Sequence, residues 1–306
     1  MLLEMNWGHQ MKKVINLTIR NIKVYFSDKG MFFTSLITPA ILLVLYSTFL
    51  ANVYKDAFTN SIPDGIELSS KLLNGLVSGQ LVGSLLSVSC ITVAFCSNML
   101  MVQDKANGSI KDLMITPTDK KTLAISYFLA SFISTLIVNL LALGLCLIYI
   151  ANSGWFMNIM DILLIILNVV GLTLFGCILS SLINSFLSTQ GQISAVGSIV
   201  SSMYGFIAGA YMPMSQFGAG LRNALLFLPT TYGTALMKNS VMASTFRELE
   251  KIIPSDAINS LKESIDVRLM FNGDAVGITT MYFIVIITII ILFVIYILKY
   301  MLCKNR

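Results

Sequence analysis

Residues 103–122 read QDKANGSIKDLMITPTDKKT and form a polar interruption between two long apolar runs. Short lysine-rich loops between membrane spans face the cytoplasm, and this loop carries four lysines. Its middle, residues 109–115, predicts about two helical turns, opened by the turn pair Asn107 and Gly108 and ended by Pro117. A short helix held between two spans can pass force from a soluble partner into a membrane domain. The alternative is an ordinary solvated loop.

The composition places the chain in a membrane. Of its 306 residues, 56% are hydrophobic and 11% are charged, and the mean hydropathy is +0.82. Soluble domains carry about 25% charged residues. Apolar runs of about 20 residues cross a bilayer as helices, so an all-α integral membrane protein is expected. The cysteines have neither metal-site nor disulfide-framework spacing and predict small buried side chains.

Six segments are long and apolar enough to be predicted spans. They are residues 32–51, 76–102, 123–150, 159–183, 191–212 and 277–298. The predicted organisation is a connector segment, residues 1–30, followed by a transmembrane domain, residues 31–306. An even number of spans puts both termini on one side, and placing them inside with residues 103–122 puts most lysines and arginines inside.

The connector segment predicts a basic amphipathic helix. Apolar residues recur at helical spacing from Met11, and Lys12, Lys13, Arg20 and Lys23 occupy much of the remaining face. Such a helix lies in the headgroup region of an anionic leaflet, which makes membrane lipids an expected partner. The alternative is a segment that only sets the topology.

Small residues and one carboxylate predict packing roles. Gly75, Gly79 and Gly83 recur every four residues at the start of the second span, which lets another helix approach closely. Asp161 lies at the edge of the fourth span, so we interpret it as a helix cap or surface charge rather than a proton relay.

Residues 213–238 are apolar but broken by proline and glycine, with Arg222 in the middle, so they cannot form one clean span. A re-entrant pair of short helices fits better, because irregular backbone at membrane depth must be buried in protein or line a cavity. Residues 239–276 are charged and predict an external loop, with an amphipathic helix near residues 255–267.

Several kinds of chemistry are missing from the sequence. The predicted spans contain essentially no charged residue, which disfavours a transporter coupled to protons or sodium. Glycine is never followed directly by lysine, so there is no phosphate-binding loop for ATP. No zinc signature or serine-nucleophile motif occurs, and nothing points to nucleic-acid binding. The sequence therefore predicts a non-catalytic chain that binds no cofactor or metal.

The order of these elements resembles the permease subunit of type-2 (type V fold) ATP-binding-cassette exporters over almost the whole length. The segment GSIKDLMITP, residues 108–117, is similar to that family's coupling helix, except that Lys111 stands where an acidic residue is usual. The segments YGF at residues 204–206 and AYMP at residues 210–213, followed by LPTTY at residues 228–232, resemble the family's fifth span and hairpin.

The resemblance implies partners and contacts. The helix within residues 104–117 would dock on a separate ATPase subunit, present in two copies, that binds ATP and Mg²⁺. The implied coupling residues are Asp104, Gly108, Lys111, Asp112, Leu113 and Pro117. The connector helix would frame the same contact. A second copy of the chain, or a sister permease, would complete the membrane part.

In this family the second and fifth spans tend to line the substrate path at the dimer interface. Polar residues for an uncharged path are Ser84, Ser87, Thr92, Ser97 and Asn98 on the second span, and Gln192, Ser194, Ser198 and Ser201 on the fifth. The alternative is interhelical hydrogen bonding, worth about 0.6 kcal/mol for each bond. A predicted outer gate consists of Tyr204, Phe206, Tyr211 and Pro213, for which core packing is the alternative.

The expected function is export of an amphipathic or lipid-like substrate, such as a drug, an antimicrobial peptide or a lipid. The uncharged spans favour this class, because a polyanion would need basic residues along its path. The resemblance implies a bacterial plasma membrane, with both termini cytoplasmic. Two alternatives are an exporter of lipid-linked polysaccharide and a non-transporting scaffold or sensor that recruits a soluble partner.

Overall fold

The computed structural model describes residues 2–61, 68–116, 118–271 and 273–302. Its first half consists of α1 (Leu2–Ser27), α2 (Lys29–Leu45), a π-helical turn (Tyr46–Leu50), α3 (Ala51–Ser61), α4 (Ser70–Ala106), α5 (Ser109–Ile115) and α6 (Lys120–Ser153). Its second half consists of α7 (Ile159–Asn184), α8 (Gln190–Ile207), a 3₁₀ turn (Met214–Gln216), α9 (Ala219–Leu225), α10 (Pro229–Leu249), α11 (Ser255–Ser264), β1 (Met270–Phe271), β2 (Asp274–Ala275) and α12 (Ile278–Leu302). The two short strands pair antiparallel, Met270 with Ala275 and Phe271 with Asp274.

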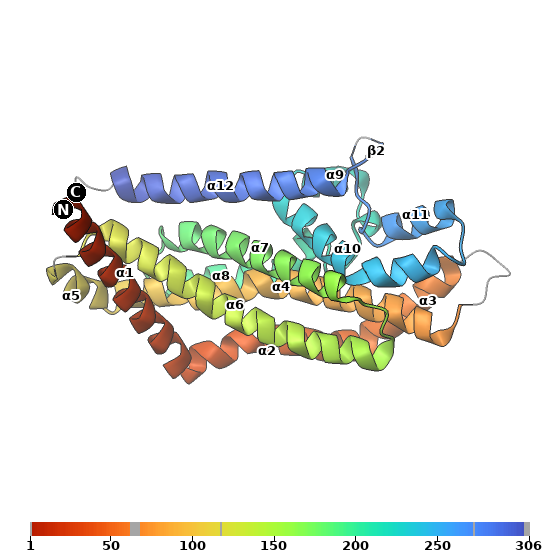
Figure 1. The fold of residues 1–306 in the computed structure, drawn as a ribbon, viewed down its shortest axis with the longest axis horizontal. Coiled ribbons are helices and arrows are strands. Elements are labelled where there is room, and N and C mark those ends of the chain that lie inside the picture. Colours follow the sequence, from red (N-terminus) through yellow and green to blue (C-terminus); the bar gives the residue numbers. More distant parts are fainter. Residues whose placement is uncertain (1, 62–67, 117, 272, 303–306) are drawn as a thin grey trace.

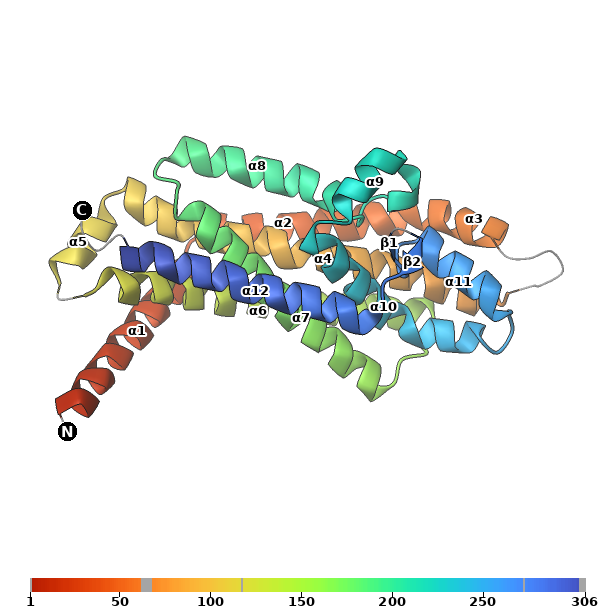
Figure 2. The same cartoon turned by 90° about the horizontal axis from the view of Figure 1, so that it is seen from above.

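Helix α4 is the centre of an elongated helical bundle (Figures 1 and 2). It packs against α2, α6, α7, α8 and α10, and nearly all of its residues from Leu76 onward are buried. A helix that is apolar all round is normally enclosed on every side. The apolar run of α4 therefore reflects burial in protein, whereas α12 is mostly exposed along the bundle.

Five helical segments in the described residues are long and apolar enough to cross a membrane. They are Lys29–Thr59, Ser70–Ala106, Lys120–Ser153, Ile159–Asn184 and Ile278–Lys299. Each contains, or nearly coincides with, one of the predicted spans. The all-α membrane class is thus supported, while the predicted fifth span, residues 191–212, is not among these segments. Its helix, α8, carries two glutamines besides several serines and ends at Ile207, where the chain turns.

The first membrane helix continues past its predicted end at residue 51. The chain passes through the π-helical turn and stays helical to Ser61. Tyr54 and Phe58 are buried in the same core cluster as Leu76 of α4. These two aromatic side chains lie one helical turn apart, so burying them together favours continued helix over a loop.

The glycine stripe of α4 packs against α10. A Cβ atom on Gly79 would lie 2.9 Å from Cγ of Met242, and one on Gly83 would lie 2.9 Å from Cα of Lys238. The close helix approach predicted from the spacing is therefore confirmed, with α10 as the neighbour. Helix α10 continues beyond residue 238 to Leu249, because Met242 and Phe246 are buried in the main core cluster.

We expect Gly83→Ala to destabilise the protein by about 1–3 kcal/mol, the usual cost of overpacking. The obstructing atom is backbone, so α10 must shift to admit the methyl group. The matched control is Gly144→Ala on α6, where no atom lies within 4 Å of the new Cβ and alanine favours the helix. Thermal unfolding in mild detergent measures both. Equal melting temperatures would show that α4 and α10 are not in contact.

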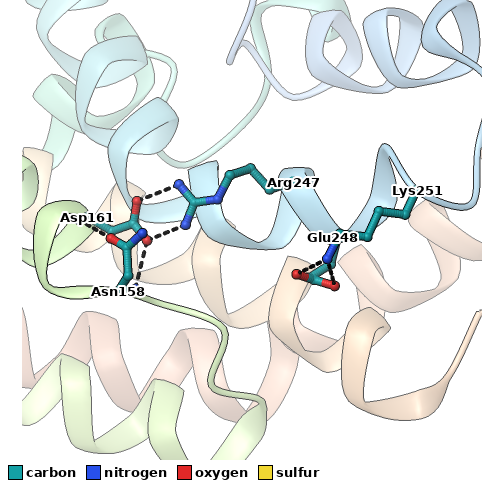
Figure 3. A network of polar contacts seen from close by, with 5 residues as sticks. All are labelled: Asn158, Asp161, Arg247, Glu248 and Lys251. Carbon is teal, nitrogen blue, oxygen red and sulfur yellow. Dashed lines mark hydrogen bonds and ion pairs between the residues drawn. The ribbon is translucent and has the colours of Figure 1, made fainter.

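An ion pair joins α7 to α10 at the end of the bundle far from α5 (Figure 3). Asn158 and Asp161 form a capping box at the start of α7, with 2.9 Å between each backbone nitrogen and the other's side-chain oxygen. The carboxylate of Asp161 also accepts hydrogen bonds of 2.8 and 2.6 Å from Arg247. Asp161 is thus confirmed as a helix cap. The nearby pair of Glu248 and Lys251 is exposed, and such pairs contribute little.

Candidate functional site

Helix α5 lies at the end of the bundle where α1 begins and α12 ends (Figures 1 and 2). Gly108 starts it with a φ of +82°, a left-handed conformation that glycine adopts without strain. Ile110 and Leu113, three residues apart, face inward onto a cluster that includes Met101 and Tyr127. The short helix is therefore held in place by its own apolar face.

The opposite face of α5 is exposed. Lys111 and Asp112 lie there as predicted coupling residues, together with Ile115, which the sequence pattern did not single out. The side chain of Ile115 is 83% exposed, whereas Met114, one turn after Ile110, is 44% exposed and lies beside the inward face. The outward position of Ile115 follows from helical spacing once Ile110 is known to face inward. Leu113, a predicted coupling residue, packs toward the protein's own core. Pro117, another predicted coupling residue, lies outside the described residues.

Asp104 faces inward, away from the exposed surface of α5. Its Oδ2 atom accepts hydrogen bonds of 2.5 Å from Nη1 of Arg20 and from the hydroxyl of Tyr127. This network joins α1, α4 and α6 close to the start of α5. The Asp104 carboxylate thus holds α1 in place. The sequence predicts that Asp104 couples to an ATPase; in this arrangement it would do so indirectly, by fixing the position of α1.

A helix covers the predicted connector segment as α1 (Leu2–Ser27), while its connector role and its place at a membrane surface stay predictions. Lys12 and Lys23 are exposed, and Lys13 and Arg20 are partly buried. The buried face includes Tyr25, whose hydroxyl donates a 2.8 Å hydrogen bond to Ser35 of α2. Helix α1 packs mainly against α6.

We expect Arg20→Ala to loosen α1 from the bundle. Hydrogen bonds to charged groups contribute about 1.5–3 kcal/mol, and the lower end applies here because a third of the Arg20 side chain is exposed. Hydrogen exchange of the α1 backbone amides should accelerate by about tenfold. Lys23→Ala, on the same helix but exposed, is the control. Unchanged exchange in Arg20→Ala would rule out the network as the anchor of α1.

The predicted path residues on the second span are buried in α4. Ser87 and Thr92 donate to carbonyls of their own helix, and Asn98 donates hydrogen bonds of 3.0 and 2.6 Å to Ser180 and Ser181 of α7. The remaining members are Ser84, buried with no hydrogen-bond partner among the described residues, and Ser97, bonded to Ser131 and Thr135 of α6. This arrangement matches interhelical packing.

The predicted path residues on the fifth span lie on α8, apart from that buried group. Ser194 and Ser198 are exposed and Ser201 is partly buried. Gln192 caps the start of α8, accepting from the backbone nitrogen of Ser188 at 2.9 Å. These serines thus lie mostly on the exposed side of a helix that packs on α4, and a substrate path through both groups stays a prediction.

Aromatic side chains of the predicted outer gate meet at the end of α8. The ring of Tyr211 lies over Gly205, in space that any Cβ would fill, and packs edge-on against Phe206 with 5.2 Å between ring centroids. Tyr204 is buried in the main core cluster, and Pro213 precedes the 3₁₀ turn. Their gating role stays a prediction.

Lys238 is fully buried, and no sequence pattern singled it out. Its Nζ donates hydrogen bonds of 2.8 Å to the Gly209 carbonyl and 3.1 Å to the Ile265 carbonyl. The neighbouring Asp266, at φ +59°, accepts a 2.7 Å bond from the Met214 backbone nitrogen. Burial lowers the pKa of Lys238 to about 8, and the charge of Asp266 opposes that shift. Lys238 thus joins the end of α8, α10 and the segment after α11.

The fold and this surface define a multi-pass helical membrane protein with a short, partly exposed helix between two long spans. Residues 12–242 match the family described as ABC-2 type transporter. The chain belongs to the ABC-2 type transporter family and is a membrane permease component. No curated protein sequence matches it.

Proposed function

We propose that this permease exports an amphipathic or lipid-like substrate while a separate ATP-binding-cassette subunit hydrolyses ATP with Mg²⁺. The match to the ABC-2 type transporter family over residues 12–242 is the observation that carries the proposal. Drugs, antimicrobial peptides and lipids fit the substrate class, because the spans offer serine and threonine hydroxyls rather than charges. A bacterial plasma membrane is the proposed location.

We propose six crossings, with α8 as the fifth span, in addition to the five long apolar segments, and both termini cytoplasmic. The end of α7 lies beside the ends of α4 and α12, since Lys105 and Lys299 both bond to Ser185. Helix α12 begins at the other end (Figure 1), so the chain must cross back between α7 and α12. The 18 residues of α8 are about 27 Å long. Helices α9 and α10 then form the proposed re-entrant hairpin.

A second copy of the chain, or a sister permease, is the proposed partner for α8. This helix packs mainly on α4 and leaves Ser194, Ser198 and Ser202 exposed with apolar neighbours such as Ile199 and Met203. Small and hydroxyl-bearing residues are the usual surfaces of helix association in membranes. Two ATPase subunits would then dock on the two α5 helices.

Affinity purification of the tagged chain from its native membrane in mild detergent tests the proposed assembly. The expected result is a stoichiometric subunit with a phosphate-binding loop, whose ATPase activity rises when substrate is added to the reconstituted complex. Recovery of the chain alone, or with partners that are not ATPases, would favour the scaffold alternative. ATP-independent transport driven by an ion gradient would contradict the proposed mechanism.

A further inference from the structure

A pocket of about 210 Å³ lies beside α5 at the end of the bundle proposed to face the cytoplasm. It is enclosed by α4, α5, α6, the start of the α7–α8 turn and α12. Its walls are largely apolar, with Met101, Met114 and Leu123 among them. The volume exceeds the about 30 Å³ share of one water molecule severalfold, which gives room for a phosphate ester but not for acyl chains.

Three lysines from three different helices line this pocket, and none of its described lining residues is acidic. They are Lys105 of α4, Lys120 of α6 and Lys299 of α12. The Nζ atoms of Lys105 and Lys299 both bond to Ser185, to its carbonyl at 3.1 Å and its hydroxyl at 2.6 Å. Two ammonium groups therefore converge on one residue, and like charges held this close repel each other.

Lys105 and Lys299 both contact neutral groups. Lys105 also donates to the carbonyls of Asn184 and Leu187, and Lys299 lies over the ring of Phe186. Such contacts orient the ammonium groups without cancelling their charge. The buried carboxylate of Asp104, next to Lys105 in the sequence, is directed to Arg20 and Tyr127. A basic pocket with apolar walls is complementary to an anion attached to a hydrophobic body.

We propose that this pocket binds the phosphate headgroup of an acidic phospholipid from the adjoining leaflet. The pocket reaches Lys299, and the two preceding turns of α12 expose Ile291, Ile295 and Leu298. Acyl chains lying along that apolar face would leave the headgroup beside the three lysines. Basic pockets between helices on the cytoplasmic side are a recognised form of lipid site. Because Met114 of α5 also lines the pocket, a bound lipid ties the coupling helix to α6 and α12.

The inference rests on the proposed orientation only in naming the leaflet as cytoplasmic. The test uses the purified full chain in detergent without an ATPase, so its failure leaves the exporter proposal untouched. Phosphatidylglycerol and phosphatidylcholine are added separately, and native mass spectrometry and thermal shift report binding. We expect the chain to bind phosphatidylglycerol in preference to phosphatidylcholine. Lys120→Gln and Lys299→Gln should each weaken phosphatidylglycerol binding about fivefold, because each basic residue near an anionic lipid contributes about 1 kcal/mol.

The matched control is Lys121→Gln, which removes the same charge from an exposed neighbour that does not line the pocket. Lys121→Gln should bind phosphatidylglycerol with the affinity of the natural chain. Lys299→Arg keeps the positive charge and should also bind it with nearly that affinity. If Lys121→Gln and Lys120→Gln weakened phosphatidylglycerol binding equally, the binding would depend on general surface charge, and the proposed pocket site would be wrong. Inorganic phosphate or glycerol phosphate stabilising the chain as strongly as phosphatidylglycerol would identify a free anion as the occupant and overturn the lipid assignment.

Discussion

Replacing Ile115 with aspartate should leave the permease folded and abolish most of its binding to the ATPase subunit. Ile115 is 83% exposed at the end of α5 and contributes little to the protein's own core. Burying an isoleucine side chain in a groove of the partner is worth about 1.5–3 kcal/mol, and burying an unpaired carboxylate there costs more. The combined change predicts an affinity at least about 100-fold lower. Binding of the purified ATPase subunit to the chain in nanodiscs measures it.

The matched control is Ile252→Asp, which makes the same substitution at an exposed position after α10. It should change neither ATPase binding nor ATPase activity. Ile115→Ala separates lost contact from added charge and should weaken binding by a smaller factor. Full ATPase binding by Ile115→Asp, with the fold intact, would show that the exposed face of α5 is not the docking surface.

The bounds of α5 could be predicted from the sequence because they depend on local signals. Gly108 has the left-handed backbone conformation that its position before the helix suggests, and Ser109–Ile115 is the helix observed. Which side of α5 faces outward was not predictable in the same way. Seven residues make about two turns, too few for the apolar pattern to separate Leu113, which packs inward, from Ile115, which does not.

The partners of the charged residues depend on contacts between distant parts of the chain. Asp104 bonds to Arg20, 84 positions away, and Asp161 bonds to Arg247, 86 positions away. A sequence shows that Asp104 stands in a polar loop and that a polar loop is usually solvated. Only the packing of α1 against α6 reveals that this carboxylate is buried.

Hydropathy identified the spans but not their burial. Residues 76–102 and 277–298 look alike as apolar runs, yet the first is enclosed by protein and the second is largely exposed. The glycine stripe was the local sign of the difference, since it predicts close helix approach. Helix α8 shows the converse: its serines lower its hydropathy, so membrane crossing has to be inferred from the path of the chain.

Lys238→Met should destabilise the protein by about 3–5 kcal/mol, because it removes two buried hydrogen bonds from a charged group, each worth about 1.5–3 kcal/mol. The side chain is fully buried, and its loss leaves the carbonyls of Gly209 and Ile265 without their ammonium donor and Asp266 without its neighbouring positive charge. Chemical unfolding in mild detergent measures the free energy. Lys251→Met, which removes an exposed lysine of a surface pair just after α10, should cost less than about 1 kcal/mol.

Asp266→Asn should be milder than Lys238→Met. Asparagine tolerates positive φ and its side-chain oxygen can still accept from the Met214 backbone nitrogen, while Lys238 keeps both carbonyl acceptors. The double variant, Lys238→Met with Asp266→Asn, should lose less free energy of unfolding than the two single variants lose together. The reason is that removing both charges leaves neither charge buried without the other. Strict additivity would mean that the two groups do not interact. A loss in Lys238→Met no larger than in Lys251→Met would place Lys238 in contact with water, contrary to the structure.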